Sequence, residues 1–202
     1  MTNSVLKNGN WSNLWFPFIS SGGKNMNYGQ IYECDIANGI GCRTALFVSG
    51  CTHRCKDCFN ECTWDFNYGK PFTKEVEDMI INSLQPAYIA GLSLLGGEPM
   101  ELSNQKALRP FMERVKKECP HSTIWIYSGY TWEELNDPNN KRCHSEDTMP
   151  ILEMTDILVD GEFVAELKNI SLNFRGSENQ RIIDVQKSLA SNMIILSEYM
   201  DN

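Results

Sequence analysis

The chain has 202 residues, of which 42% are hydrophobic and 22% are charged, with 18 Lys and Arg against 26 Asp and Glu. This is the composition of a globular chain long enough to bury one core, and it argues against a disordered or fibrous protein. The net charge of −8 weighs against coating nucleic acid or anionic membrane, so we expect neither as a partner.

Eight cysteines are the most informative feature of the composition. The longest apolar stretch near the N-terminus, residues 14–19, is broken by Pro17 and is too short for an export signal or a membrane span. In a chain without an export signal, closely spaced cysteines more often bind metal or do redox chemistry than form a disulfide framework. We therefore predict a cytoplasmic protein.

Residues 1–25 are rich in Gly, Ser and Asn and show little periodicity, which predicts a poorly ordered N-terminal extension. The alternative is an ordered arm, because the aromatic side chains of Trp11, Trp15 and Phe16 are costly to leave in water.

From Tyr28 onward, apolar runs alternate with amphipathic stretches, which is the rhythm of βα units. One helix is predicted between Thr73 and Pro86, and another around residues 111–115 with Pro110 at its start. The spacing of Thr131 and Glu134 fits a capping box that opens a short helix, and residues 136–148 are predicted to form a loop. Strands are predicted at 45–48, 92–95, 123–127, 157–159 and 181–185.

Polar or Gly-rich residues follow the predicted strands. In parallel α/β architectures, ligands bind at the edge where the strands end. Cys51, Cys55 and Cys58 lie on the loop after the strand at 45–48, in the spacing CxxxCxxC. Three thiolates on one loop can hold a soft-metal centre, and thiolate ligation suits zinc or an iron-sulfur cluster. A structural zinc site or a group of buried free thiols is the alternative.

This CxxxCxxC loop, directly after an apolar strand and followed by Phe59, resembles the cluster signature of the radical S-adenosylmethionine (radical SAM) superfamily. The resemblance implies that Cys51, Cys55 and Cys58 hold a 4Fe-4S cluster whose fourth iron is chelated by S-adenosylmethionine. It also implies that Asp57, Cys58 and Phe59 lie against this cofactor.

Gly96, Gly97 and Glu98, followed by Pro99, are similar to the GGEP motif of the same superfamily. The two glycines permit close backbone approach, and the Glu98 carboxylate can accept hydrogen bonds from an ammonium. The resemblance implies that Gly96, Gly97 and Glu98 bind the methionine amino group. A Gly-Gly turn alone says little, but it gains weight about 40 residues after the cysteine motif.

Residues 35–43, 46–51, 58–60 and 63–64 resemble the activating proteins of glycyl-radical enzymes. Within that group, residues 124–130, 159–163, 175–177, 179–180 and 181–186 resemble those of anaerobic ribonucleoside-triphosphate reductase. The resemblance spans roughly residues 26–189 and implies a radical SAM domain there, with 190–202 as a C-terminal tail. The implied fold is α/β, a partial (βα) barrel of about five or six mostly parallel strands. The implied activity is formation of a glycyl radical on the reductase by reductive cleavage of S-adenosylmethionine, with electrons from a donor such as a flavodoxin.

Two other functions remain open: a small radical SAM enzyme acting on a metabolite, and a non-catalytic iron-sulfur electron carrier with Cys62 as a fourth ligand. We expect Cys62 not to be a ligand, because three-cysteine spacing leaves one iron open. The remaining cysteines, Cys42 included, have no assigned function, and Cys34, Cys119 and Cys143 are expected to be small hydrophobes or exposed thiols. His53 is expected to be a solvated loop residue. Arg43 and Arg175 are expected to be surface or ion-paired residues, or to contact the cofactor carboxylate or the partner.

Overall fold

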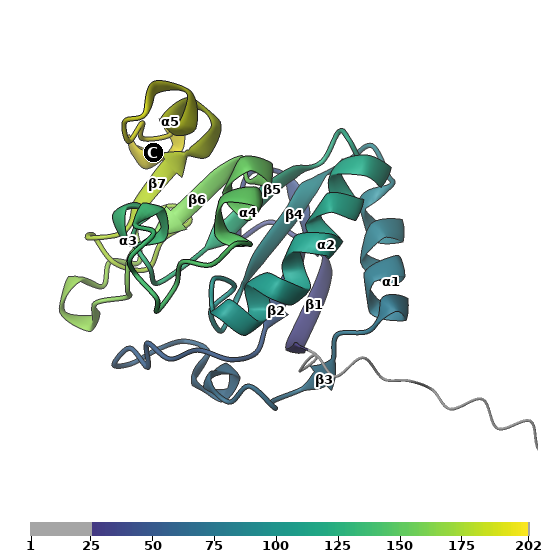
Figure 1. Cartoon of the computed structure of the whole chain (residues 1–202), viewed down its shortest axis with the longest axis horizontal. Coiled ribbons are helices and arrows are strands. Elements are labelled where there is room, and N and C mark those ends of the chain that lie inside the picture. Colours follow the sequence, from purple (N-terminus) through teal and green to yellow (C-terminus); the bar gives the residue numbers. More distant parts are fainter. Residues whose placement is uncertain (1–25, 202) are drawn as a thin grey trace, which may run out of the picture.

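The computed structural model describes residues 26–201, so the expectations for residues 1–25 lie outside the described residues. A seven-stranded sheet forms its centre, with helices packed against one face (Figure 1). The strand order is β3-β1-β2-β4-β5-β6-β7. The sheet is open, because β3 and β7 are its two edges. Between residues 26 and 201, no helix is long and apolar enough to cross a membrane.

Four strands in the middle of the sheet run parallel: β2, β4, β5 and β6. Their bounds are Cys42–Val48, Ile89–Gly96, Thr123–Tyr127 and Ile157–Asp160. The pairings Val48 with Gly96 and Tyr127 with Val159 bring the carboxyl ends of these strands to one edge. The predicted strands are confirmed, and so is the edge at which polar residues gather.

Three further strands pair antiparallel: β1 (Asn27–Asp35), β3 (Lys70–Pro71) and β7 (Arg181–Asp184). The sheet thus has seven strands rather than five or six, and its parallel part is confined to the middle. The sequence of β1 was not predicted as a strand, because its mostly half-exposed residues give no continuous apolar run.

The helices are α1 (Lys74–Leu84), α2 (Leu102–Glu118), α3 (Trp132–Asn136), α4 (Thr148–Met154) and α5 (Val185–Ser191). The main core packs between helices α1, α2 and α4 and the sheet (Figure 1). A second apolar cluster, around Trp125 and Val159, forms on the other face. There the ring of Tyr199, from the 3-10 turn Glu198–Asp201, stacks on Trp125 at 5.6 Å.

The position of Pro110 was predicted wrongly: it lies inside α2 rather than at its start. Proline cannot donate the hydrogen bond that the helix would make with Lys106. The helix continues because the turns before Pro110 are fixed by the buried side chains of Asn104, Gln105 and Leu108, while Pro110 itself is exposed. The capping box at α3 is confirmed, with both reciprocal hydrogen bonds present. The loop predicted over residues 136–148 agrees with the structure to within one residue at each end, since α3 ends at Asn136 and α4 begins at Thr148.

Candidate functional site

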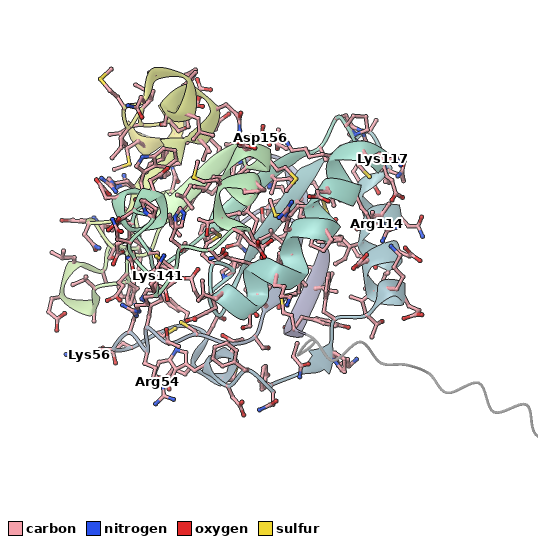
Figure 2. All side chains as sticks on the ribbon, in the orientation of Figure 1. Arg54, Lys56, Arg114, Lys117, Lys141 and Asp156 are labelled. Atoms are coloured by element: carbon pink, nitrogen blue, oxygen red, sulfur yellow. A yellow bond between two sulfur atoms is a disulfide. The ribbon has the colours of Figure 1, made fainter. Side chains whose placement is uncertain are left out.

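The cysteine loop follows β2 and is closed at its base by two backbone hydrogen bonds. Gly50 N donates to Thr63 O at 2.7 Å, and Cys51 N donates to Trp64 O at 3.2 Å. The loop then passes through the 3-10 turn Glu61–Trp64. Arg54 and Asp57 both adopt left-handed backbone angles, with φ of 53° and 57°. Figure 2 shows the side chains of Arg54 and Lys56 at the outer edge of the loop, pointing away from the body of the protein.

All three cysteines of the motif line one cavity of about 390 Å³, which we call the central cavity. Its other walls come from the ends of β4 and β5, from residues 161–180, and from the hairpin that joins β1 to β2. The cavity therefore lies at the edge of the sheet where the parallel strands end, as the sequence predicts.

Most of the residues predicted to bind the cofactor are brought together in this cavity. Cys58, Phe59, Gly96, Gly97 and Glu98 all line it, whereas Asp57 does not. Phe59 is 71% exposed; its ring contacts Phe163 edge-on at 5.7 Å, and Lys168 Nζ lies 4.7 Å from its centroid.

The Gly-Gly pair joins the ends of two neighbouring strands. Gly97 N donates to Val48 O, and Glu98 N donates to Gly50 O, both at 2.8 Å. A Cβ atom on Gly97 would stand 2.6 Å from the Gly50 carbonyl oxygen, and Gly96 has a φ of 107°. The close approach that these glycines permit is thus an approach of β4 to the start of the cysteine loop.

Glu98 is 1% exposed, and its carboxylate is a buried acceptor. It accepts hydrogen bonds from Met100 N at 2.7 Å, Ser128 Oγ at 2.9 Å and Gly129 N at 2.6 Å. These bonds satisfy a buried negative charge. They also tie the end of β4 to the end of β5, so Glu98 has a structural role that the sequence did not show.

The expectation that His53 is solvated is wrong, because its side chain is only 2% exposed. Nδ1 lies 2.5 Å from a Glu162 carboxylate oxygen, and Nε2 lies 3.3 Å from Glu98 Oε2. The imidazole also packs against Tyr130 at 4.3 Å. Burial alone lowers the pKa of His53, but the two carboxylates outweigh it and raise the pKa. We call His53, Glu98 and Glu162 the histidine bridge, since it joins the cysteine loop to the ends of β4 and β6.

Gly129 is the sequence signal for this bridge that was missed. A Cβ atom at Gly129 would stand 2.8 Å from the His53 ring, so only glycine leaves room for the imidazole here. The exposed pair of Lys56 and Glu166, at 3.1 Å, adds a second and weaker link between the cysteine loop and residues 161–180.

The thiols of Cys51 and Cys55 are hard to ionise without a metal. Burial, followed by the Glu98 charge, raises the pKa of the Cys51 thiol to about 12, and burial also raises the pKa of Cys55. Metal binding would displace these protons, because the thiolate is the ligand. The described residues contain no three His, Cys, Asp or Glu side chains gathered as a single metal ion requires. In a four-iron cluster each cysteine binds its own iron, and three thiols around one cavity fit that arrangement.

The other cysteines are separate from the central cavity. Cys62 is exposed and does not line the central cavity. A hydrogen bond between its side chain and the Tyr68 hydroxyl raises the pKa of Tyr68. Cys119 and Cys143 are buried free thiols, as predicted. The expectation for Cys34 is wrong, because it forms a disulfide with Cys42. The β1–β2 hairpin brings their Cα atoms to 5.3 Å, within the range that a disulfide spans.

Arg43 was also predicted wrongly, since it contacts neither solvent nor the central cavity. It is 1% exposed, and its guanidinium donates to Ser93 Oγ, Thr123 Oγ1 and backbone oxygens that include Leu92 O and Thr123 O. It lies over Trp125 at 5.3 Å. Burial lowers its pKa to about 10. Arg175, by contrast, lines the central cavity.

An open, mixed α/β sheet with three cysteines around one cavity at its carboxyl edge defines an iron-sulfur class of protein. Residues 37–183 match the family described as a 4Fe-4S single cluster domain. The chain is 45% identical over 157 residues to the anaerobic ribonucleoside-triphosphate reductase-activating protein of Escherichia coli strain K12, covering 77% of this chain and 96% of that protein.

Two further relatives carry the same name. The Vibrio cholerae protein is 45% identical over 159 residues, covering 78% of this chain and 97% of its own length. The protein of Enterobacteria phage T4 is 36% identical over 157 residues, which cover 78% of this chain and 93% of the phage protein. The chain belongs to the family of anaerobic ribonucleoside-triphosphate reductase-activating proteins.

Proposed function

We propose that this protein activates anaerobic ribonucleoside-triphosphate reductase in the cytoplasm by generating a glycyl radical on it. The observation that carries the proposal is that Cys51, Cys55 and Cys58 line one cavity together with Gly96, Gly97 and Glu98. The open sheet is consistent with a partial barrel of the radical SAM type, formed by residues 26–189. One side of such a barrel stays accessible to a protein substrate.

In this proposal Cys51, Cys55 and Cys58 hold a 4Fe-4S cluster, and S-adenosylmethionine occupies the rest of the central cavity. When bound, the cluster would supply the single electron that cleaves S-adenosylmethionine to methionine and a 5′-deoxyadenosyl radical, and this radical would take a hydrogen atom from a glycine Cα of the reductase. A donor such as a flavodoxin supplies the electron.

The protein's own residues position the cofactor and limit access to it. Phe59, exposed at the cavity wall, offers an aromatic face to the adenine. The Glu98 carboxylate places negative charge near the methionine ammonium, in addition to the three donors it already holds. The histidine bridge fixes the cysteine loop, so that the three thiols keep their spacing around the cavity.

The test is anaerobic reconstitution with iron and sulfide, followed by reduction in the presence of S-adenosylmethionine. We expect 5′-deoxyadenosine, and a glycyl radical by electron paramagnetic resonance when the reductase is added. Absence of 5′-deoxyadenosine would contradict the enzyme assignment, and cleavage without a protein radical would favour an enzyme that acts on a metabolite.

Cys62→Ser distinguishes the proposed enzyme from an electron carrier with four cysteine ligands. Because Cys62 lies outside the central cavity, we expect the variant to keep its cluster and its cleavage activity, whereas Cys55→Ser loses both. Loss of the cluster in Cys62→Ser would show that Cys62 closes the site.

A further inference from the structure

Four residues that line the central cavity carry a buried side-chain atom without a hydrogen-bond partner within residues 26–201. One is His53 Nε2, which already lies 3.3 Å from Glu98 Oε2; the other three are Trp64 Nε1, Tyr127 Oη and Arg175 Nε. The indole and guanidinium nitrogens can only donate, and a tyrosine hydroxyl can donate as well as accept. Buried donors left without an acceptor are costly. Their convergence on one cavity indicates a ligand that is rich in hydrogen-bond acceptors.

Arg175 adds a positive charge that no carboxylate in the described part of the chain neutralises. Its Nη1 donates to Gln180 O at 3.2 Å and its Nη2 to Met200 O at 2.7 Å, so both bonds go to neutral carbonyls. Arg181, only six residues away in the sequence, instead pairs with Asp160 and Glu133. A guanidinium held by carbonyls beside a cavity is suited to an anionic ligand group, and above all to a carboxylate.

Tyr127 occupies the last position of β5, on the face of the sheet that carries Trp125. Burial raises the pKa of its hydroxyl well above the usual range, so the group stays protonated and can donate at neutral pH. Trp64 differs from the other two, because its backbone closes the base of the cysteine loop. Tyr127 and Arg175 therefore remain as the two donors available to a ligand.

We infer that Arg175 binds the carboxylate of the methionine part of S-adenosylmethionine and that Tyr127 donates a hydrogen bond to its adenosine part. The inference rests on the proposed function. The ligand carries a single carboxylate, which is the group that matches Arg175. Its ammonium and sulfonium offer no acceptor. With the carboxylate assigned to Arg175, we assign Tyr127 to the adenosine, whose ring nitrogens and ribose oxygens are acceptors.

Charge is then distributed along the central cavity as the ligand requires. Glu98 provides negative charge at the ends of β2 and β4, and Arg175 provides positive charge from residues 161–180. An amino acid zwitterion carries the complementary pair of charges. Electrostatic complementarity of this kind fixes the orientation of a ligand as well as its affinity.

The test measures binding to the cluster-loaded protein by anaerobic equilibrium dialysis without reductant, so that no turnover is needed. The probes are S-adenosylmethionine and decarboxylated S-adenosylmethionine, which lacks only the carboxylate. We expect Arg175→Gln to weaken binding of S-adenosylmethionine about 10- to 100-fold, the loss typical of a charge-assisted hydrogen bond. The same variant should change binding of the decarboxylated ligand less than about two-fold. Tyr127→Phe should weaken the binding of both ligands equally, by about three- to ten-fold.

Arg109→Gln is the matched control, because Arg109 pairs with Glu113 and Asp147 at the surface of α2, away from the cavity. It should leave both affinities unchanged. Arg175 also holds two backbone carbonyls, so folding of each variant is checked by circular dichroism. Should Arg175→Gln not fold, Arg175→Lys keeps the charge, and we expect it to show the same ligand pattern with a smaller loss.

Each remaining outcome overturns a defined statement. If the unmodified protein binds neither ligand, the proposed function fails and the inference fails with it. Suppose that the unmodified protein binds S-adenosylmethionine. If Arg175→Gln then binds it equally well, or if its affinity for both ligands falls by the same factor, the inference alone fails. Arg175→Gln could instead keep its affinity for S-adenosylmethionine and bind the reductase less tightly. Arg175 would then bind a carboxylate of the partner protein, and this result also overturns the inference.

Discussion

Replacing Glu98 with Gln tests whether this buried carboxylate holds the site together. One carboxylate oxygen serves Met100 N and Ser128 Oγ, and the other serves Gly129 N beside His53 Nε2. A glutamine has only one acceptor oxygen, so in either orientation its amide group faces at least one buried donor. An unsatisfied buried donor costs about 1–3 kcal/mol, and loss of a charge-assisted bond costs a similar amount. We expect Glu98→Gln to lower the free energy of unfolding by about 2–5 kcal/mol.

The measurement is urea unfolding of the cluster-free protein, followed by circular dichroism, so that metal binding does not contribute to the stability. Glu113→Gln makes the same chemical change in an exposed pair with Arg109, and it should cost less than about 0.5 kcal/mol. If Glu98→Gln were as stable as Glu113→Gln, the carboxylate would not be a structural acceptor, and its role would be limited to ligand binding.

Three other changes test the fold. Pro110→Ala restores a donor to the exposed face of α2, where Lys106 O lacks one, and we expect about 1–2 kcal/mol of added stability in urea unfolding. Gly97→Ala places a methyl group 2.6 Å from a backbone oxygen, and we expect a loss of at least about 1–3 kcal/mol; an unchanged midpoint would refute this packing. Arg181 holds the pKa of Glu133 below its usual value of 4.5, so the pair stabilises the fold above that pH and stops doing so as the pH falls through the lowered pKa. Glu133→Gln should therefore be less stable than the parent at pH 7, and the difference should disappear at acid pH once the carboxyl of the parent is protonated.

The parallel part of the sheet was predictable because each of its strands is a short apolar run that ends in Gly, Ser or Asp. The antiparallel strand β1 was not predictable, since most of its side chains are at least partly exposed and the pairing with β2 determines its position. Pro110 shows a similar limit. Local preference places proline at the start of a helix, but tertiary packing of Asn104, Gln105 and Leu108 extends α2 by two turns before it.

The site shows the same division between local pattern and long-range contact. The cysteine spacing and the Gly-Gly pair are local, so the sequence could indicate them. In the histidine bridge, His53 contacts Glu98 and Glu162, which lie 45 and 109 positions further along the chain. No local pattern in the sequence indicates that either glutamate is a partner of His53. The charge on Arg175 was visible, but that Arg175 forms no ion pair within residues 26–201 is a fact of packing. A motif therefore identifies the groups that carry chemistry, whereas the contacts that orient those groups and leave donors free for a ligand become visible only in the folded chain.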